Sequence, residues 1–491
     1  MNAISNRPSQ RENVELRNWS DRISMPLTVG CDKFGSGGIV LTADHKTQFV
    51  VVLFLWAGLL LLASGNICGN VQAQTQTRVR ITVSSPNEIL IEADLAVPSR
   101  SWSFRNAYAG ALGIAERIDG FRANGALARK LAAGEFRSEQ NAGKIDYIVR
   151  VRRPSAADVA HVSWLTEEHG FLMFADLLPQ AMEAFSVEFI LPSGWTIHSS
   201  LTPDTNGHYN VFEPDAAVFF AGRGIRKTSK KGLDSFLAGA WPFKDSVASN
   251  AAVRVLEKYL ELTKFQLPER PVLMVAPLPV QTGSTKWRAQ TRGSTVVLLL
   301  DPQAQSGNWK GQLEIIFTHE ALHWWVPNAL PLKGDYDWFF EGFTLYTALL
   351  TALDLKAIDL PEYFATLRRV YDSYLSYEDT GSLIEASEKR WTSNTPIVYD
   401  KGMLVAFLYD LLVREQSGGK TTLLDRYREL FEHPVANHAE GNDVIIRLLS
   451  ATPAAAEFVR KHVQGRAPLE LETVLKELPA DKRRLKSLGY R

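Results

Sequence analysis

Hydrophobic and polar positions divide the chain into a part with strand periodicity and a later part with helix periodicity. Between residues 78 and 224, apolar and polar residues alternate in runs such as "RVRITV", "KIDYIVRVR" and "FSVEFILP", which are separated by Pro, Gly, Asn and Asp. A helical stretch is expected to interrupt these runs at "GALARKLAAGEF". The pattern predicts an antiparallel β domain, sandwich-like or saddle-shaped.

The periodicity becomes helical after about residue 239. "AAVRVLEKYLELTKF" carries apolar residues at three- and four-residue spacing, and two strands are expected at "RPVLMVAPL" and "STVVLLLD". Pro and Gly separate several of the later helices, which are expected over residues 310–326, 336–354, 361–376, 397–415, 420–433 and 442–464. The chain is therefore predicted to be an α+β protein, with an N-terminal antiparallel β domain followed by a mostly helical domain and C-terminal helices.

The N-terminal region carries a candidate targeting segment. The chain is apolar and uncharged between Phe49 and Ala63, and Lys46 precedes this stretch. A signal-peptide core has up to about 15 residues and a membrane span needs about 20, so a cleaved signal that ends after "VQA" at Ala73 fits best. An uncleaved anchor that uses flanking residues stays open. In both cases the protein is expected to be exported (periplasmic or extracellular) or membrane-anchored, with its bulk outside the cytoplasm.

Charge and cysteine content restrict the chemistry. The formal net charge is +0 at pH 7 and there is no basic stripe with interleaved aromatic residues, so nothing favours nucleic-acid binding. The two cysteines, Cys31 and Cys68, both precede the expected cleavage site. The remaining chain therefore has no thiolate for a zinc site, and any metal ion must be held by His, Asp or Glu. The composition leaves the oligomeric state open.

The stretch "THEALHWW" contains two histidines, His319 and His323, around Glu320. On a helix, residues four apart lie on the same face, so both imidazoles could bind one metal ion. Zn²⁺ suits imidazole nitrogen, and a neighbouring glutamate can accept a proton from a metal-activated water. On this motif alone, a buried helix whose histidines make ordinary hydrogen bonds stays open.

A third ligand is available in the next predicted helix, "DYDWFFEGFTLYTALLTAL", which contains Glu341. Prolines and a glycine between the two helices would let the second fold back on the first. His319, His323 and Glu341 would then form the two-histidine, one-carboxylate set of a hydrolytic site for one zinc ion. Alternatively, Glu341 could be a solvated acidic residue near the N-terminus of its helix, where the helix dipole stabilises a negative charge.

These motifs, together with "YDKGMLVAFLYDLLVREQSGGKTTLLDRYREL", resemble the gluzincin metallopeptidases. The resemblance is strongest to the bacterial glycyl aminopeptidase family, related to aminopeptidase N and leukotriene A4 hydrolase. It extends from about residue 264 to the C-terminus and includes "SLIEASEKRW" and "FVRKHVQGRAPLELETVL". It implies a thermolysin-like catalytic domain, and we expect this domain organisation: an N-terminal extension (1–73), a β domain (74–235), the catalytic domain (236–435) and a C-terminal helical segment (436–491).

The resemblance also implies roles for individual residues. His319, His323 and Glu341 match the zinc ligands, and Glu320 matches the general base that activates water. Tyr399, in "VYDKG", matches a tyrosine whose hydroxyl supports the oxyanion of the tetrahedral intermediate. Strand "STVVLLLD" would be the edge strand that pairs with an extended peptide substrate. The C-terminal helices are implied to cover the cleft and to limit substrates to short or unfolded peptides.

The main departure concerns recognition of a free N-terminus. Gln290, in "AQTRGS", stands where the family tends to have a glutamate that grips the substrate's amine. A neutral amide can bind an ammonium group but gives no charge pairing. Gln290 is therefore a candidate substrate-binding residue, and the choice between exopeptidase and endopeptidase stays open.

The sequence therefore predicts a zinc metallopeptidase, aminopeptidase-like, that acts on peptides. The alternatives are a catalytically silent peptide-binding or scaffold protein on the same fold, and a zinc hydrolase with a non-peptide substrate. Asp335 and Asp337 could orient a ligand histidine, or one of them could cap a helix. The remaining histidines, His161 among them, form no spaced cluster and are expected to be ordinary surface or core residues.

Overall fold

The structure is a computed structural model that describes residues 76–108, 111–151, 154, 159–280, 286–304, 308–377, 381–390, 395–433, 435–436 and 438–490. Both cysteines and the apolar segment between Phe49 and Ala63 lie outside these residues, so the signal peptide or anchor stays a prediction. Within the described ranges, no helix combines the length and the apolar character needed to cross a membrane.

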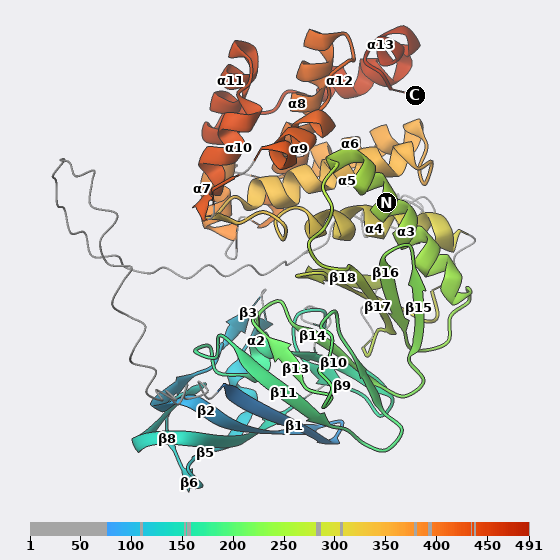
Figure 1. Ribbon diagram of the computed structural model, residues 1–491. Helices are drawn as coiled ribbons and strands as arrows, with labels where there is room; N and C mark the ends of the chain where they lie inside the picture. Colours follow the sequence, from blue (N-terminus) through green and yellow to red (C-terminus); the bar gives the residue numbers. More distant parts are fainter. Residues whose placement is uncertain are drawn as a thin grey trace, which may run out of the picture.

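A large sheet dominates the N-terminal half (Figure 1). Its eight strands follow the order β13-β11-β1-β2-β8-β5-β6, with β7 paired to β8. Their bounds are β1 Thr77–Ser85, β2 Glu88–Ser103, β5 Ile118–Ala123, β6 Ala126–Leu127, β7 Arg129–Ala132, β8 Glu135–Arg150, β11 Phe185–Ile190 and β13 Tyr209–Val211. All pairs are antiparallel except β1 with β11, which is parallel. The predicted antiparallel β domain is confirmed with this one exception.

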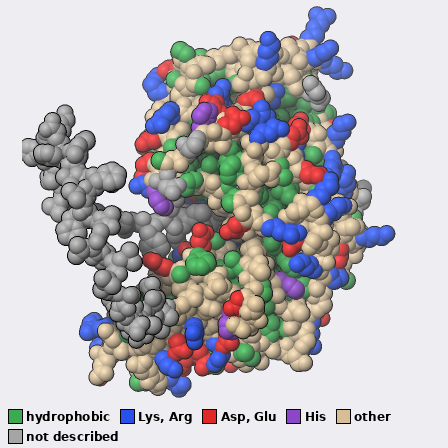
Figure 2. Space-filling view, in the orientation of Figure 1, with side chains coloured by type: hydrophobic (Ala, Val, Ile, Leu, Met, Phe, Trp, Pro, Cys, Tyr) green, Lys and Arg blue, Asp and Glu red, His purple; other side chains and the backbone are tan. Residues whose placement is uncertain are grey.

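Alternate residues of the large sheet face the core and the solvent, as the sequence pattern predicts. In β1, Val79 and Ile81 are buried, whereas Arg80 lies on the solvent face and pairs with Glu188 of β11. Acidic and basic side chains lie close together over the lower part of the molecule in Figure 2, where Figure 1 places this sheet. The buried face is rich in aromatic rings that stack at close range, such as Phe121 on Phe136 at 4.6 Å.

The prediction of a helix at "GALARKLAAGEF" is wrong. This stretch forms β6, β7 and the start of β8. Gly125 and Gly134 adopt left-handed backbone conformations, with φ of 82° and 77°, and each lies at a hairpin turn. Pairing with neighbouring strands therefore overrides the helix propensity of the alanine, leucine and lysine residues.

Smaller elements complete the β domain. A four-stranded sheet has the order β12-β14-β10-β9. The bounds are β3 Ala107–Tyr108, β4 Ala111–Leu112, η1 Ile114–Arg117, β9 Trp164–Leu165, β10 His169–Met173, α2 Phe174–Leu177, β12 Thr196–His198 and β14 Val218–Gly222. This second sheet packs on the large one in a shared hydrophobic core.

A five-stranded sheet of order β15-β16-β17-β19-β18 links the β domain to the helices. Its strands are β15 Arg226–Lys230, β16 Leu233–Leu237, β17 Val272–Pro277, β18 Trp287–Arg292 and β19 Thr295–Leu300. In β17, Leu273 and Val275 pack in the helical core, whereas Met274 and Ala276 pack in the core of the β domain. Both faces are therefore buried, which explains the continuous apolar runs of β17 and β19.

Two expectations about this sheet change. Strand β19 ("TVVLLL") lies between β17 and β18 and is not an edge strand, so that expectation is wrong. The edge strand on this side of the sheet is β18, "WRAQTR", which the sequence pattern does not indicate because it has no apolar alternation. The predicted division after residue 235 falls within β16, which pairs with β17. The division of the chain into domains stays a prediction.

In the part of the chain after β19 that the structure describes, the elements are helical except for one small strand pair, β20 Leu332–Lys333 and β21 Ala439–Glu440. The helical segments are α3 Asp245–Thr263, α4 Trp309–Glu320, η2 Ala321–Trp324, η3 Trp338–Phe343, α5 Thr344–Asp354, α6 Leu360–Tyr374, α7 Leu383–Glu388, η5 Ile397–Lys401, α8 Gly402–Ser417, α9 Leu423–Glu432, α10 Gly441–Leu449, α11 Pro453–Val459, η6 Arg460–Gln464, α12 Glu472–Glu477, η7 Leu478–Ala480 and α13 Lys482–Ser487. The single helix expected over 442–464 is interrupted, because Thr452 caps a new helix that Pro453 begins. Figure 1 shows the β domain at one end and these helices at the other, which confirms the predicted fold class.

Candidate metal centre

Helix α4 holds the first half of the candidate site. Asn308 caps its N-terminus by accepting a hydrogen bond from the Gly311 amide at 3.0 Å. The apolar side of α4 is buried in the helical core, which fixes His319 and Glu320 at the C-terminal end of the helix. The chain continues in a tighter 3₁₀ turn, η2, that carries His323. The Nε2 atoms of the two histidines lie 3.1 Å apart, as the four-residue spacing predicts.

Glu341 lies on η3, a π-helical turn directly before α5, and its side chain approaches His319 and His323. Its Oε2 atom lies 3.8 Å from the Nε2 atoms of both His319 and His323. These ligand atoms all lie within 4.8 Å of one another, and the three side chains are buried. Glu341 Oε2 accepts no hydrogen bond from any described residue. Two imidazole nitrogens and a carboxylate oxygen that converge in this way fit a zinc ion.

The hydrogen bonding of His323 also suits a metal ligand. Its Nδ1 lies 3.0 Å from the Val326 carbonyl oxygen, so Nδ1 carries the proton and Nε2 has its lone pair directed at the cluster. Burial lowers the pKa of His323 to about 4 and holds the pKa of His319 well below its ordinary value. Both imidazoles are therefore neutral at pH 7, the form that binds a metal ion.

Glu320 is held by a residue that the sequence analysis did not single out. The Thr291 hydroxyl, from edge strand β18, lies 2.7 Å from Glu320 Oε2 and 2.8 Å from the Glu320 carbonyl oxygen. The other carboxylate oxygen, Oε1, has no partner in the described part of the chain. Burial raises the pKa of Glu320 to about 7, and the Thr291 hydrogen bond opposes this shift. A carboxylate in this environment can exchange a proton near neutral pH.

A buried arginine, Arg390, joins the predicted ligand Glu341 to the predicted oxyanion donor Tyr399. Its Nη2 atom donates to Glu341 Oε1 at 2.9 Å and to the Tyr399 hydroxyl at 2.5 Å, and its Nη1 atom donates to Asp337. Asp337 therefore binds this arginine and not a ligand histidine. Sequence reasoning missed Arg390, because an arginine at the end of a short charged helix is typical of a solvated position.

Two glycines allow the helices of the site to approach closely. A Cβ atom on Gly342 would lie 2.5 Å from the Cα of Gly402, and one on Gly402 would lie 2.9 Å from the Cα of Gly342. Gly342 follows Glu341 directly, and Gly402 lies one helical turn after Tyr399. This backbone contact therefore places the carboxylate and the phenol side by side.

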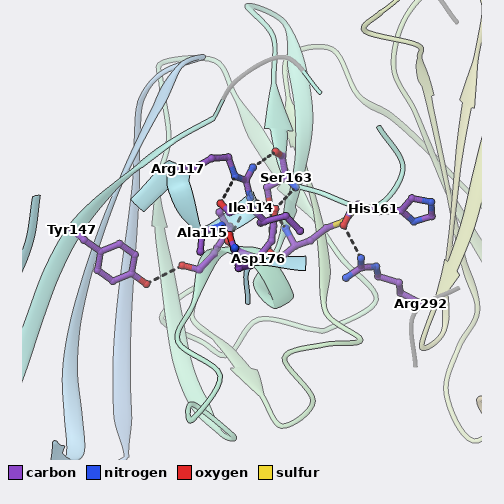
Figure 3. Close-up of polar contacts among 11 residues, drawn as sticks. Ile114, Ala115, Arg117, Tyr147, His161, Ser163, Asp176 and Arg292 are labelled. Atoms are coloured by element: carbon purple, nitrogen blue, oxygen red, sulfur yellow. Dashed lines mark hydrogen bonds and ion pairs between the residues drawn. The ribbon is translucent and has the colours of Figure 1, made fainter. Parts of the chain in front are cut away.

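Gln290, the predicted substrate-binding residue, contacts the β domain. It lies on β18 with an exposed fraction of 1%, and its amide lies 2.8 Å from His161 Nδ1. When the amide nitrogen faces His161, the amide oxygen accepts from Arg292 Nε at 2.9 Å. Arg292 also donates to the His161 carbonyl oxygen at 2.8 Å (Figure 3). The edge strand and the β domain are thus joined at the residue expected to recognise the substrate.

A largely buried ion pair anchors Ser163, which lies two residues after His161 in the chain. Asp176 accepts hydrogen bonds from the Ser163 amide at 2.7 Å and the Ser163 hydroxyl at 2.6 Å, and it forms an ion pair with Arg117 (Figure 3). His161 itself is 3% exposed. The sequence predicts an ordinary core or surface histidine at this position and does not predict its contact with Gln290. Gln290 is distant in the chain, and neither the neighbours nor the spacing of His161 indicates such a partner.

Acidification is expected to destabilise the protein through His161. Burial, aided by the nearby Arg292, lowers the pKa of His161 to about 3 from its ordinary 6.5. The unfolded chain therefore binds a proton below pH 6.5 that the native protein does not, and native stability falls as pH decreases through this range. At pH 5 the loss is about 2 kcal/mol relative to neutral pH.

Urea unfolding at pH 7 and pH 5 checks this expectation. The His161→Gln variant should lose about 2 kcal/mol less stability between the two pH values than the wild type. His433→Gln changes an exposed histidine and should retain the wild-type pH dependence. Equal pH dependence in His161→Gln and in the wild type would contradict the assignment.

Comparison with known proteins identifies the class of fold. No protein-family model matches the chain, and no curated protein matches it. The solved structures that match the chain in shape include an aminopeptidase N family protein and M1 zinc metallopeptidases. The resemblance to gluzincin metallopeptidases that the sequence indicates is thus confirmed for the fold.

Two solved structures illustrate this likeness. An aminopeptidase N family protein from Idiomarina loihiensis matches with a TM-score of 0.65 at 17% identity, over 82% of this chain and 78% of that chain. The M1 zinc metallopeptidase from Deinococcus radiodurans, as a mutant bound to a Tyr-Ser-Ala substrate, matches with a TM-score of 0.52 at 15% identity, over 80% of this chain and 94% of that chain. At these identities the likeness establishes the fold alone.

Proposed function

We propose that this protein is a zinc-dependent metallopeptidase that hydrolyses peptide bonds in short or unfolded peptides. The observation that carries the proposal is the convergence of His319, His323 and Glu341 beside the buried carboxylate of Glu320. The fold of M1 metallopeptidases supports it. A zinc ion held by these three side chains would polarise the substrate carbonyl and activate a water molecule.

The protein's own residues would carry the proton transfers and the charge stabilisation. Glu320 Oε1, which has no partner among the described residues, would accept the proton of the attacking water and return it to the leaving amine. Thr291 holds the other oxygen of this carboxylate and so fixes its orientation. Tyr399 would donate its hydroxyl hydrogen to the oxyanion that develops in the transition state.

Edge strand β18 is the element that would align the substrate. It is the last strand of its sheet, and its outer edge pairs with no described strand. An extended peptide could add to this edge as a further strand through main-chain hydrogen bonds, as peptides do at the exposed sheet edges of other proteins. Because Thr291 of β18 contacts Glu320, a peptide on this edge would pass close to the candidate general base.

The preference for a free N-terminus is proposed to be weak. Gln290 is neutral and its amide is engaged by His161 and Arg292, so it offers no carboxylate to a substrate ammonium group. We therefore propose an aminopeptidase-like enzyme whose choice between terminal and internal bonds is set by other contacts. We also propose that it acts outside the cytoplasm, on the strength of the apolar segment between Phe49 and Ala63.

A peptide library tests the function. The full-length protein, stripped of metal and then reloaded with zinc, should cleave a mixed library only in the zinc-loaded form. Product masses would show single-residue trimming for an aminopeptidase and internal cuts for an endopeptidase. Folded, zinc-loaded protein that binds peptides without cleaving them would instead support the silent peptide-binding alternative.

A further inference from the structure

Arg390 is completely buried at a point where Glu341, Asp337 and Tyr399 meet. The proposed hydrolysis assigns no task to a cation at this position. Burying a guanidinium group is costly unless charged partners and hydrogen bonds compensate it. The placement of this side chain is therefore informative about the site that surrounds it.

Arg390 binds one of the two carboxylate oxygens of Glu341 and leaves the other directed at the metal position. Oε1 accepts a hydrogen bond from the guanidinium group at 2.9 Å. Oε2, which has no hydrogen-bond partner among the described residues, lies 3.8 Å from the Nε2 atoms of both histidines. The carboxylate is thus held by one oxygen and presents the other to the metal position. An outer partner that orients a ligand carboxylate in this way tunes metal affinity.

The same nitrogen of Arg390 also orients Tyr399. The phenol hydroxyl accepts its hydrogen bond at 2.5 Å, so the hydroxyl's single hydrogen must point elsewhere. The guanidinium group also lies 5.3 Å from the centroid of the Tyr399 ring. The Tyr399 hydroxyl also forms a side-chain hydrogen bond with Glu341, so its hydrogen is directed to the metal-ligand side of the site. During the reaction this hydrogen would be donated to the oxyanion instead.

Asp337 completes the arrangement by fixing the guanidinium plane. It binds Nη1 while Glu341 and Tyr399 share Nη2, so the planar group is held from both ends. The four residues come from three segments of the chain: Asp337 directly precedes η3 and Glu341 lies in it, Arg390 follows α7, and Tyr399 lies in η5. Lysine has a single point charge and could not form this set of bonds.

We propose that Arg390 is a positioning residue that couples the metal ligand Glu341 to the oxyanion donor Tyr399. A single guanidinium group sets the orientation of both, with Asp337 as its anchor. This inference rests on the proposed peptidase function for its catalytic half. Its metal-binding half stands on the geometry of Glu341 and can be measured without any substrate.

The test compares full-length wild type with Arg390→Lys, which keeps the buried positive charge. Zinc affinity, measured against a competing chelator, should fall by about 10-fold to 100-fold. The kcat for peptide cleavage by zinc-saturated protein should fall by about 10-fold to 100-fold with KM nearly unchanged, because the lost interaction acts in the transition state. Arg368→Lys changes a partly exposed arginine on α6 that pairs with Asp372 and Glu472, away from the metal cluster, and should leave both quantities unchanged.

A double-variant cycle separates positioning from general stability. In the Tyr399→Phe background, Arg390→Lys should lower kcat much less than it does in the wild type, since the group that it orients is already absent. If Arg390→Lys does not fold, Asp337→Asn tests the same arrangement and should lower zinc affinity by up to about 10-fold. Wild-type zinc affinity in the folded variant, or fully additive effects on kcat, would overturn the proposal.

The outcomes also separate this inference from the function itself. Wild-type protein that binds zinc but cleaves no peptide would refute the proposed function, and the zinc affinities would still decide the role of Arg390. Wild-type protein that binds no zinc would overturn both.

Discussion

Replacing Glu320 by glutamine is expected to lower kcat for peptide cleavage by about 100-fold to 10,000-fold, the range that a general base contributes. The amide has nearly the same volume as the carboxyl group and can still accept the hydrogen bond from Thr291, so the fold should be unaffected. It cannot accept a proton from water. Zinc binding should persist, because His319, His323 and Glu341 are unchanged. Initial rates on a set of peptides, with zinc content measured on the same samples, provide the test.

Glu314→Gln is the matched control for this experiment. Glu314 lies on the same helix, α4, and is also buried, with an exposed fraction of 2%. Its carboxylate pairs with Arg254 and is not part of the metal cluster. The control should therefore lose stability but keep its activity per folded, zinc-loaded molecule. Undiminished cleavage by Glu320→Gln would exclude Glu320 as the base and would direct attention to another group.

The part of the site that depends on local geometry could be predicted from the sequence. Two histidines four residues apart on a helix share a face, so the spacing alone predicts that His319 and His323 lie together. Glu341 required only that the next helix fold back, which the intervening prolines and glycine allow. The structure brings these three side chains to one point.

The groups that hold these residues in place could not be predicted in this way. Thr291 reaches Glu320 from an edge strand, and Arg390 reaches Glu341 across a turn between two helices. Such contacts depend on how distant segments pack, and no spacing in the sequence encodes them. Strand β18 was missed for a related reason, since its polar residues face other protein groups and give no apolar alternation.

The second large effect is expected from His323→Gln, which should weaken zinc binding by more than about 100-fold. Loss of an outer partner of a metal ligand already costs about 10-fold to 100-fold, and His323 would be a ligand itself. Zinc at 1,000 times its dissociation constant stabilises a native protein by about 4 kcal/mol. The wild type should therefore show a clear rise in Tm on addition of zinc, and the variant should show almost none. His433→Gln, an exposed histidine, should behave as the wild type.

Thermal unfolding in chelator separates the metal contribution from the structural one. Glutamine cannot reproduce the contact of His323 Nδ1 with the Val326 carbonyl oxygen, so the variant should be less stable even without metal. The zinc-dependent part of the Tm is the difference between the two conditions, and it is insensitive to this local loss. If His323→Gln kept the full zinc-dependent shift, the two histidines would be buried residues with ordinary hydrogen bonds and the cluster would not be a metal site. A shift present in the wild type and absent in His323→Gln would identify the cluster as the place where zinc binds, independently of any assay for cleavage.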